Sequence, residues 1–129
     1  MAKKTNPKTA TKNADNVLND LILFAIREKK GKEIVSLDLS KLKEAPADHF
    51  FICTADSTTQ ARAIAESVED QIWKNAHQRP FCIEGRENSQ WILLDYANSI
   101  VHIFLKEYRD FYNIEDLWND GQKTQHQEA

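Results

Sequence analysis

The fold of this chain of 129 residues depends on the stretch WILLDYANSIVHIFL, which spans residues 91–105. The stretch contains two apolar runs, residues 91–96 and 99–105, with Ala97 and Asn98 between them. A connection of two residues joins antiparallel neighbours, so these runs predict a β-hairpin. Because apolar residues occupy both faces of each run, we expect the hairpin to lie in a sheet that is covered on both sides.

Three further strands are predicted upstream of the hairpin. Residues 33–39 alternate between apolar and polar, which is typical of a strand with one buried face. Residues 50–53 are apolar on both faces and predict a central strand. A third short strand is expected at residues 81–84, so the sheet has about five strands in all, and its strand order is left open.

Two long helices are predicted from apolar spacing and capping residues. The first begins at Asp15, where Asn13 or Asp15 can cap it, and ends at Gly31. The second follows the capping-box pattern of residues 57–60 and stops before Pro80. Together with the strands, these helices predict an α/β (α+β) domain with a mixed sheet.

The two ends of the chain are predicted to lie outside this domain, which we expect to span residues 15–120. Residues 1–14 contain four lysines, no acidic residue and no apolar periodicity, and they predict a disordered basic tail. Residues 121–129 predict a flexible C-terminal tail. The N-terminal stretch lacks the apolar core of a secretory signal, and an organelle transit peptide is less favoured because arginine is absent.

The composition favours a cytoplasmic protein. No apolar run approaches the roughly 20 residues that a membrane helix needs, so no membrane contact is expected. Cys53 and Cys82 both lie in apolar stretches, and we expect buried reduced thiols rather than a disulfide or a catalytic thiol.

The charge distribution favours a basic protein partner over a nucleic acid. The net charge is −3, but residues 15–129 hold 13 basic and 20 acidic residues, a net charge of −7. Nucleic-acid binders present a basic surface to phosphate, and this domain has the opposite sign. The lysines of the tail are expected to make a secondary contact with RNA phosphates at most.

The predicted helices are too few to cover the predicted sheet. Five strands at about 4.8 Å spacing form a sheet roughly 20 Å wide, and two helices of about 10 Å diameter cover one face of it. The second face then requires the aromatic segment 108–118, a second copy of the chain or another protein. We favour a partner or self-association over coverage by the C-terminal segment alone, because large exposed apolar patches usually mark interaction sites.

Three blocks of the sequence resemble the ribosomal silencing factor (iojap) family. They are ADHFFICT (47–54) running into STTQARAIA (57–65), EG (84–85) followed by WILLDY (91–96) and ANSIVHIF (97–104), and RDFYNIEDLW (109–118). The blocks follow the family's order and spacing, and the resemblance extends over about residues 16–119. The sequence departs from the family at His49, where tyrosine is usual, and at Ala97-Asn98, where the turn is commonly Gly-Asp.

The resemblance implies a fold, a partner and a function. The implied fold is a mixed sheet with helices, related to nucleotidyltransferases without their catalytic residues, and a homodimer is common. Family members bind the large-subunit ribosomal protein numbered fourteen and block association with the small subunit. The implied function is therefore that of a translational repressor on the large ribosomal subunit.

Six residues of the matched blocks are candidates for binding that partner, because Trp, Tyr and Arg are enriched at binding hot spots. They are Trp91, Leu93, Asp95, Tyr96, Arg109 and Tyr112. Four of them have a structural alternative. The two aromatic residues of the hairpin can belong to the core, Asp95 can cap a turn, and Arg109 can pair with Asp110 or Glu107.

No catalytic, metal or cofactor site is predicted. The turn at residues 54–57 lacks the glycine of a nucleotidyltransferase, and Asp38 and Asp95 stand alone on their strands. The spacing of His49 and His77 from the cysteines does not suit a metal, and His102 is expected to be a structural residue. A nucleotidyltransferase-like enzyme and an RNA-binding factor remain the less favoured alternatives.

Overall fold

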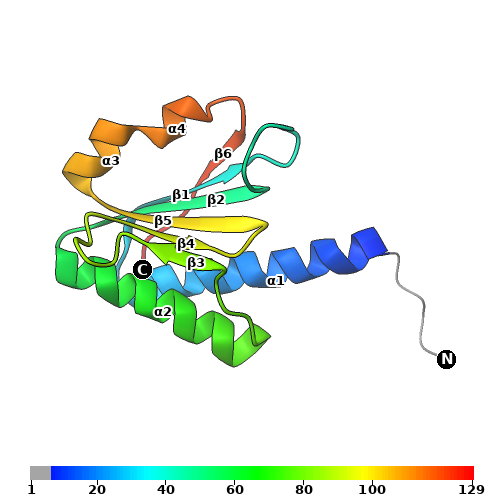
Figure 1. Cartoon of the computed structure of the whole chain (residues 1–129), viewed down its shortest axis with the longest axis horizontal. Coiled ribbons are helices and arrows are strands. Elements are labelled where there is room, and N and C mark those ends of the chain that lie inside the picture. Colours follow the sequence, from blue (N-terminus) through cyan, green and yellow to red (C-terminus); the bar gives the residue numbers. More distant parts are fainter. Residues whose placement is uncertain (1–6) are drawn as a thin grey trace.

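The computed structural model describes residues 7–129, with side chains from Ala14 onward. Within these residues, six strands form one mixed sheet in the order β3-β4-β5-β2-β1-β6 (Figure 1). The strands are β1 (Lys32–Asp38), β2 (His49–Ala55), β3 (Cys82–Glu84), β4 (Trp91–Asp95), β5 (Ser99–Leu105) and β6 (Gln122–Gln125). The central strands β2 and β5 are parallel, and the other neighbouring pairs are antiparallel. The predicted mixed sheet and its hairpin β4–β5 are confirmed.

Two long helices, α1 (Pro7–Glu28) and α2 (Thr58–Ala76), cover one face of the sheet (Figure 1). We call this the inner face. The side chain of Ser57 accepts from the backbone N–H of Gln60 at 3.0 Å, as the capping box predicts. Gln60 departs from the capping-box pattern, because its Oε1 accepts from Asp56 N at 2.6 Å instead of from Ser57 N. Its Nε2 donates to the carbonyls of Lys29 and Lys30. Gln60 therefore ties the start of α2 to the residues that follow α1.

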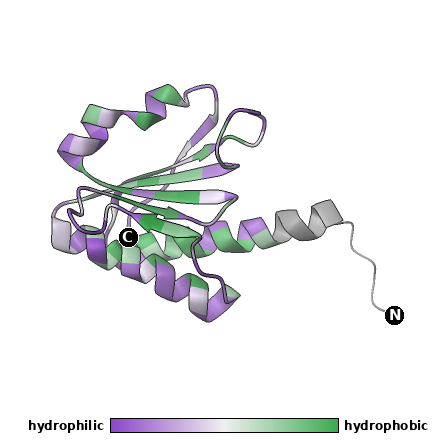
Figure 2. Cartoon of the chain, in the orientation of Figure 1, coloured by the Kyte–Doolittle hydropathy of each residue, from purple (hydrophilic) through white to green (hydrophobic). Residues whose placement is uncertain are grey.

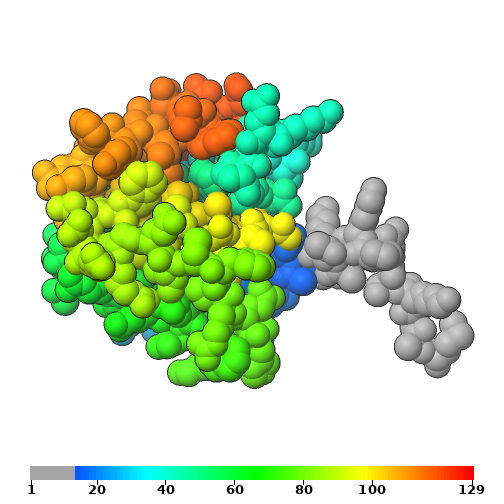
Figure 3. Space-filling model, viewed as in Figure 1, coloured from blue at the N-terminus to red at the C-terminus, as the bar shows by residue number. Residues whose placement is uncertain are grey.

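The opposite, outer face is covered in part by the same chain. The short helices α3 (Lys106–Tyr112) and α4 (Ile114–Leu117) and the loop 39–48 lie over it (Figures 1 and 3). They enclose a second apolar core, whose buried members are Val35, Leu37, Leu39, Ala47, Phe50, Ile52, Ile100 and Phe104. Figure 2 shows the apolar residues concentrated along the strands between the two layers. A partner was favoured over the C-terminal segment as the cover of this face. That expectation is wrong for this part of the sheet, because the chain's own helices and loop enclose it.

Both chain ends depart from the predicted domain boundaries. The predicted flexible tail, residues 121–129, contains β6, which pairs antiparallel with β1, and His126 N donates to Ile34 O at 2.8 Å. All four side chains of β6 are exposed, so backbone pairing with β1 holds a polar edge strand that shows no apolar pattern. Helix α1 begins at Pro7 rather than Asp15, and proline is well suited to a first helical turn. Residues 1–6 of the predicted basic tail lie outside the described residues.

The two cysteines lie in different environments. Cys53 is buried on β2, as predicted, whereas Cys82 is exposed on the edge strand β3. The prediction of two buried thiols is therefore wrong for Cys82, because the outer layer does not reach this edge. None of the described helices combines the length and the apolar character that a membrane crossing requires.

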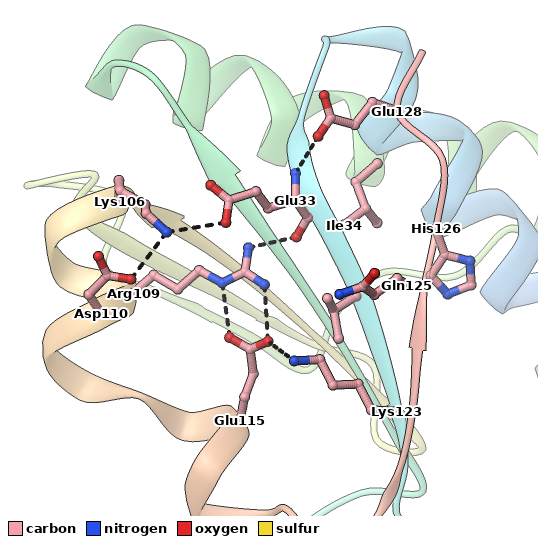
Figure 4. Close-up of a pocket in the computed structure, with 11 residues that line it drawn as sticks. Glu33, Ile34, Lys106, Arg109, Asp110, Glu115, Lys123, Gln125, His126 and Glu128 are labelled. Atoms are coloured by element: carbon pink, nitrogen blue, oxygen red, sulfur yellow. Dashed lines mark hydrogen bonds and ion pairs between the residues drawn. The ribbon is translucent and has the colours of Figure 1, made fainter.

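Arg109 fastens the outer layer to the sheet (Figure 4). Its side chain is 6% exposed and donates to both carboxylate oxygens of Glu115, at 3.0 and 3.1 Å. Its Nη1 also donates to Glu33 O at 2.6 Å and to Thr54 Oγ1 at 2.9 Å. Burial raises the pKa of Glu115, but Arg109 and then Lys123 outweigh it and hold the pKa below its usual value. One guanidinium thus joins α3, α4, β1 and β2.

His102 lies in the outer core on β5. Its side chain is 4% exposed, and its ring centre lies 4.7 Å from that of Phe50 in an edge-on contact. The Nδ1 atom accepts a hydrogen bond from Trp91 Nε1 at 3.1 Å. Burial lowers the pKa of His102 to about 3, so the imidazole is neutral in the folded protein at neutral pH.

Replacing Arg109 by methionine should lower the free energy of unfolding by about 3 kcal/mol, because the change leaves Glu115 and Thr54 without their buried partner. Urea unfolding measures this loss. Lys106→Met is the matched control, because it removes an exposed ion pair with Glu33 and should change stability little. Equal effects of the two substitutions would contradict the structural role of Arg109.

His102 should make the fold acid-sensitive. Its pKa of about 3 in the folded state lies below the ordinary 6.5, so the unfolded chain binds the proton more readily between these values. The stability present above pH 6.5 is therefore lost as pH falls toward 3. Between pH 7 and pH 5, urea unfolding should show the wild type losing about 2 kcal/mol more than His102→Leu. Parallel losses in both proteins would rule out a buried neutral imidazole.

Candidate functional site

Three of the six predicted binding residues share the outer face of β4. Alternation along β4 directs Trp91, Leu93 and Asp95 outward and Ile92 and Leu94 toward the helices. All three outward side chains are half-buried. On the neighbouring edge strand β3, the two outward residues are exposed. The outer layer therefore leaves β3 uncovered and covers β4 only in part, and we call these two strands the open strip of the sheet.

Aromatic side chains extend the open strip onto α3. The Trp91 ring stacks on Phe104, with ring centres 4.9 Å apart, and lies 4.8 Å from the ring of Tyr112. Phe111 meets Tyr112 edge-on at 5.1 Å. Phe111 is 79% exposed and Tyr112 is 48% exposed. We call Trp91, Leu93, Phe111 and Tyr112 the aromatic patch.

Phe111 was not among the predicted binding residues, although it lies in the third matched block. Its exposure could not be inferred from the sequence, because it depends on how α3 packs on the sheet with Arg109 buried. A large apolar side chain that is mostly exposed on a short helix marks an interaction surface more strongly than a half-buried one.

Two carboxylates flank the patch on the sheet. Glu84 of β3 lies directly opposite Leu93, and Cys82 lies opposite Asp95, so these side chains share the outer face. One Asp95 oxygen accepts from Ala97 N at 2.8 Å, which is the turn-capping role that the sequence left open. This bond supports Ala97 at φ 71°, a left-handed conformation that favours the glycine usual in this turn. The patch is thus an apolar surface with an acidic margin.

The other two predicted residues, Tyr96 and Arg109, lie apart from the patch. Tyr96 is 5% exposed and packs in the inner core, where burial raises the pKa of its hydroxyl. Arg109 pairs with Glu115 rather than with Asp110 or Glu107. Both residues serve the fold from buried positions, and we leave them out of the proposed surface.

A charged hollow lies between β6, β1 and α3, toward the opposite edge of the sheet from β3 and β4 (Figure 4). It has a volume of about 370 Å³, and its cations Lys106, Arg109 and Lys123 pair with the carboxylates of Glu33, Asp110 and Glu115. Glu128 also lines it, so most of its charge is balanced within the hollow. Among the described residues, no group of three or more His, Cys, Asp or Glu side chains is placed to hold a metal ion. What the outer face offers instead is aromatic contact area, which suits the binding of a protein surface.

Comparison with known proteins identifies the family of the chain. Residues 11–129 match the family model described as "Ribosomal silencing factor during starvation", RsfS. The chain is 38% identical over 106 residues to a ribosomal silencing factor of Chromobacterium violaceum, covering 82% of this chain and 84% of the relative. A crystal structure of a protein from the same species superposes with a TM-score of 0.76 at 35% identity, covering 84% of this chain and 88% of that one.

A more distant relative carries a name that mentions the ribosome directly. A mouse protein named "Mitochondrial assembly of ribosomal large subunit protein 1" is 24% identical over 102 residues, covering 77% of this chain and 44% of that protein. The family model covers nearly the whole chain, and the fold matches a solved structure of a related sequence. The chain belongs to the ribosomal silencing factor (RsfS) family.

Proposed function

We propose that the protein represses translation by binding the large ribosomal subunit and excluding the small one. Its partner in this proposal is the large-subunit ribosomal protein numbered fourteen, and its place of action is the cytoplasm. Family membership supports a role at the ribosome, and the name of the mouse relative supports the large subunit. The observation that carries the proposal is the aromatic patch, left open on an outer face that the chain otherwise covers.

The composition of the patch suits protein binding. Trp91, Tyr112 and Phe111 form a continuous row of ring contacts on β4 and α3, next to Leu93. Large aromatic rings carry much of the binding free energy at protein interfaces, because they bury a large area and lose little conformational entropy. A strand and a helix hold these rings, so the surface is largely formed before the partner arrives.

The charge around the patch favours a basic partner. Glu84 is exposed and Asp95 half-buried beside Leu93, and residues 15–129 have a net charge of −7. A positively charged protein surface would be steered toward this face and oriented by it. The lysines among residues 1–14 have the opposite sign, and we propose that they add a secondary contact with ribosomal RNA.

Occupancy alone is sufficient for repression in this proposal. The domain docks on the large subunit where the small subunit would join, so the two compete for one surface and no chemical reaction is required. A second copy of the chain is the alternative occupant of the patch. Self-association would then compete with docking, because both would bury the same rings.

Sedimentation of purified bacterial subunits tests the repression directly. Adding the protein should reduce the fraction of joined ribosomes, and the protein should migrate with the large subunit. Unchanged joining, or migration with the small subunit, would refute the proposal. The protein alone should be compared by sedimentation over a range of concentrations, which reports a dimer that the patch would form.

Replacing Trp91 by alanine should weaken binding to the large subunit by about 30- to 1,000-fold, because the substitution removes the central ring of the patch. Binding is measured by titrating labelled protein with purified large subunits. Trp73→Ala is the matched control, because Trp73 lies on α2 in the helix layer and is 42% exposed. The control should bind as the wild type does, and an equal loss in both variants would contradict the assignment.

Phe111→Ala separates docking from stability. Because Phe111 is 79% exposed, its removal should leave the unfolding midpoint in urea nearly unchanged. The same substitution should weaken binding to the large subunit about tenfold or more if this ring is buried by the partner. Wild-type affinity would show that the patch ends at Tyr112.

A further inference from the structure

The imidazole of His102 lies directly beneath the aromatic patch and makes an unusual set of contacts. It packs among the rings of Phe50, Trp91 and Phe104, with ring centres at 4.7, 5.9 and 6.2 Å. Its Nδ1 accepts from Trp91 Nε1 at 3.1 Å, so the proton of the neutral ring resides on Nε2. That Nε2 is buried and has no hydrogen-bond partner within the part of the chain that the structure describes.

Folding alone does not favour a histidine at this position. A buried donor without a partner destabilises the folded state, and the neighbours are otherwise apolar. A leucine on the same strand would fill the space and would remove the stranded Nε2. The hydrogen bond that histidine provides and leucine lacks is the bond to the indole of Trp91.

We propose that His102 is the positioning residue of the docking surface: it holds the Trp91 indole against Phe104 and satisfies the indole N–H from inside the protein. The inference rests on the proposed function, because it assigns Trp91 as the anchor of that surface. The stacking contact, with 26° between the Trp91 and Phe104 planes, and the hydrogen bond together fix the ring's orientation.

The bond matters most when a partner covers the ring. An indole N–H that loses its water on docking and finds no acceptor weakens binding, because the full desolvation free energy of that group is left uncompensated. An acceptor already in place within the protein removes this opposition. It also limits the rotation of the ring before binding, so less side-chain entropy is lost on docking.

Two substitutions separate positioning from stability. His102→Leu removes the acceptor and the stranded Nε2, so its stability to urea at pH 7 should equal or exceed that of the wild type. Its affinity for purified large subunits should fall about 5- to 150-fold. His102→Asn retains an acceptor near the Nδ1 position, and it should bind within a few-fold of the wild type although it is less stable. A purely structural role predicts that affinity follows stability in both variants.

The coupling to Trp91 is tested in a Trp91→Phe background. Phenylalanine has no N–H, so His102→Leu should cause no further loss of affinity there. An equal loss in both backgrounds, or no loss beside Trp91, would overturn the inference.

Indole hydrogen exchange in the free protein gives a test independent of the ribosome. The chain has three tryptophans, which give three indole N–H signals by NMR. The Trp91 signal should exchange more slowly in the wild type and in His102→Asn than in His102→Leu, and equal rates in all three would refute the bond. If the wild type does not bind large subunits at all, the proposed function fails, whereas the exchange rates still decide whether His102 holds the indole.

Discussion

The structure depends on the apolar character of both faces of the central parallel pair, β2 and β5. Six of the seven residues of β5 are buried, as are six of the seven of β2. Such strands are stable only when both faces of the sheet are removed from water. The helices α1 and α2 meet this requirement on the inner face. On the outer face the chain uses α3, α4 and the loop 39–48, and this cover leaves β3 open and β4 only partly covered.

The open strip follows from the way the outer layer is attached. Arg109 joins α3 and α4 to β1 and β2, so the layer is centred on that side of the sheet. The end of α3 then carries Phe111 and Tyr112 to the margin of the layer, beside Trp91 of β4. The buried ion pair of Arg109 and Glu115 therefore contributes to the aromatic patch indirectly, because it positions α3, which carries Phe111 and Tyr112. His102 acts from below on the same surface, through its bond to the Trp91 indole.

Much of the fold could be predicted from sequence because it is expressed in apolar periodicity. The hairpin at residues 91–105, the central strand and both long helices have strong patterns, and all of them are confirmed. The edge strand β6 could not be predicted, because its four exposed polar residues have no pattern and are held by backbone pairing with β1. The exposure of Cys82 also depends on the extent of the outer layer, which no local pattern reports.

The candidate site was predictable in part. The matched blocks supplied Trp91, Leu93 and Asp95, which the structure places together on the outer face of β4. Tyr96 is buried because it continues the inward phase of that strand. Arginine is enriched at binding sites, but two of the three partners of Arg109, Glu33 and Thr54, come from distant parts of the chain, so its burial depends on tertiary contacts. The exposure of Phe111 depends on how α3 packs on the sheet, and His102 gains its significance from Trp91 on β4, which sequence alone does not identify.

The central claim is that the aromatic patch itself contacts the large ribosomal subunit. Site-specific photo-crosslinking measures this contact directly, with a photoreactive phenylalanine analogue placed at position 111 and, as a control, at position 73 of the helix layer. The account predicts a crosslink from position 111 to one large-subunit protein and none from position 73. Crosslinks from position 73 but not from 111, or from 111 to small-subunit proteins, would contradict it.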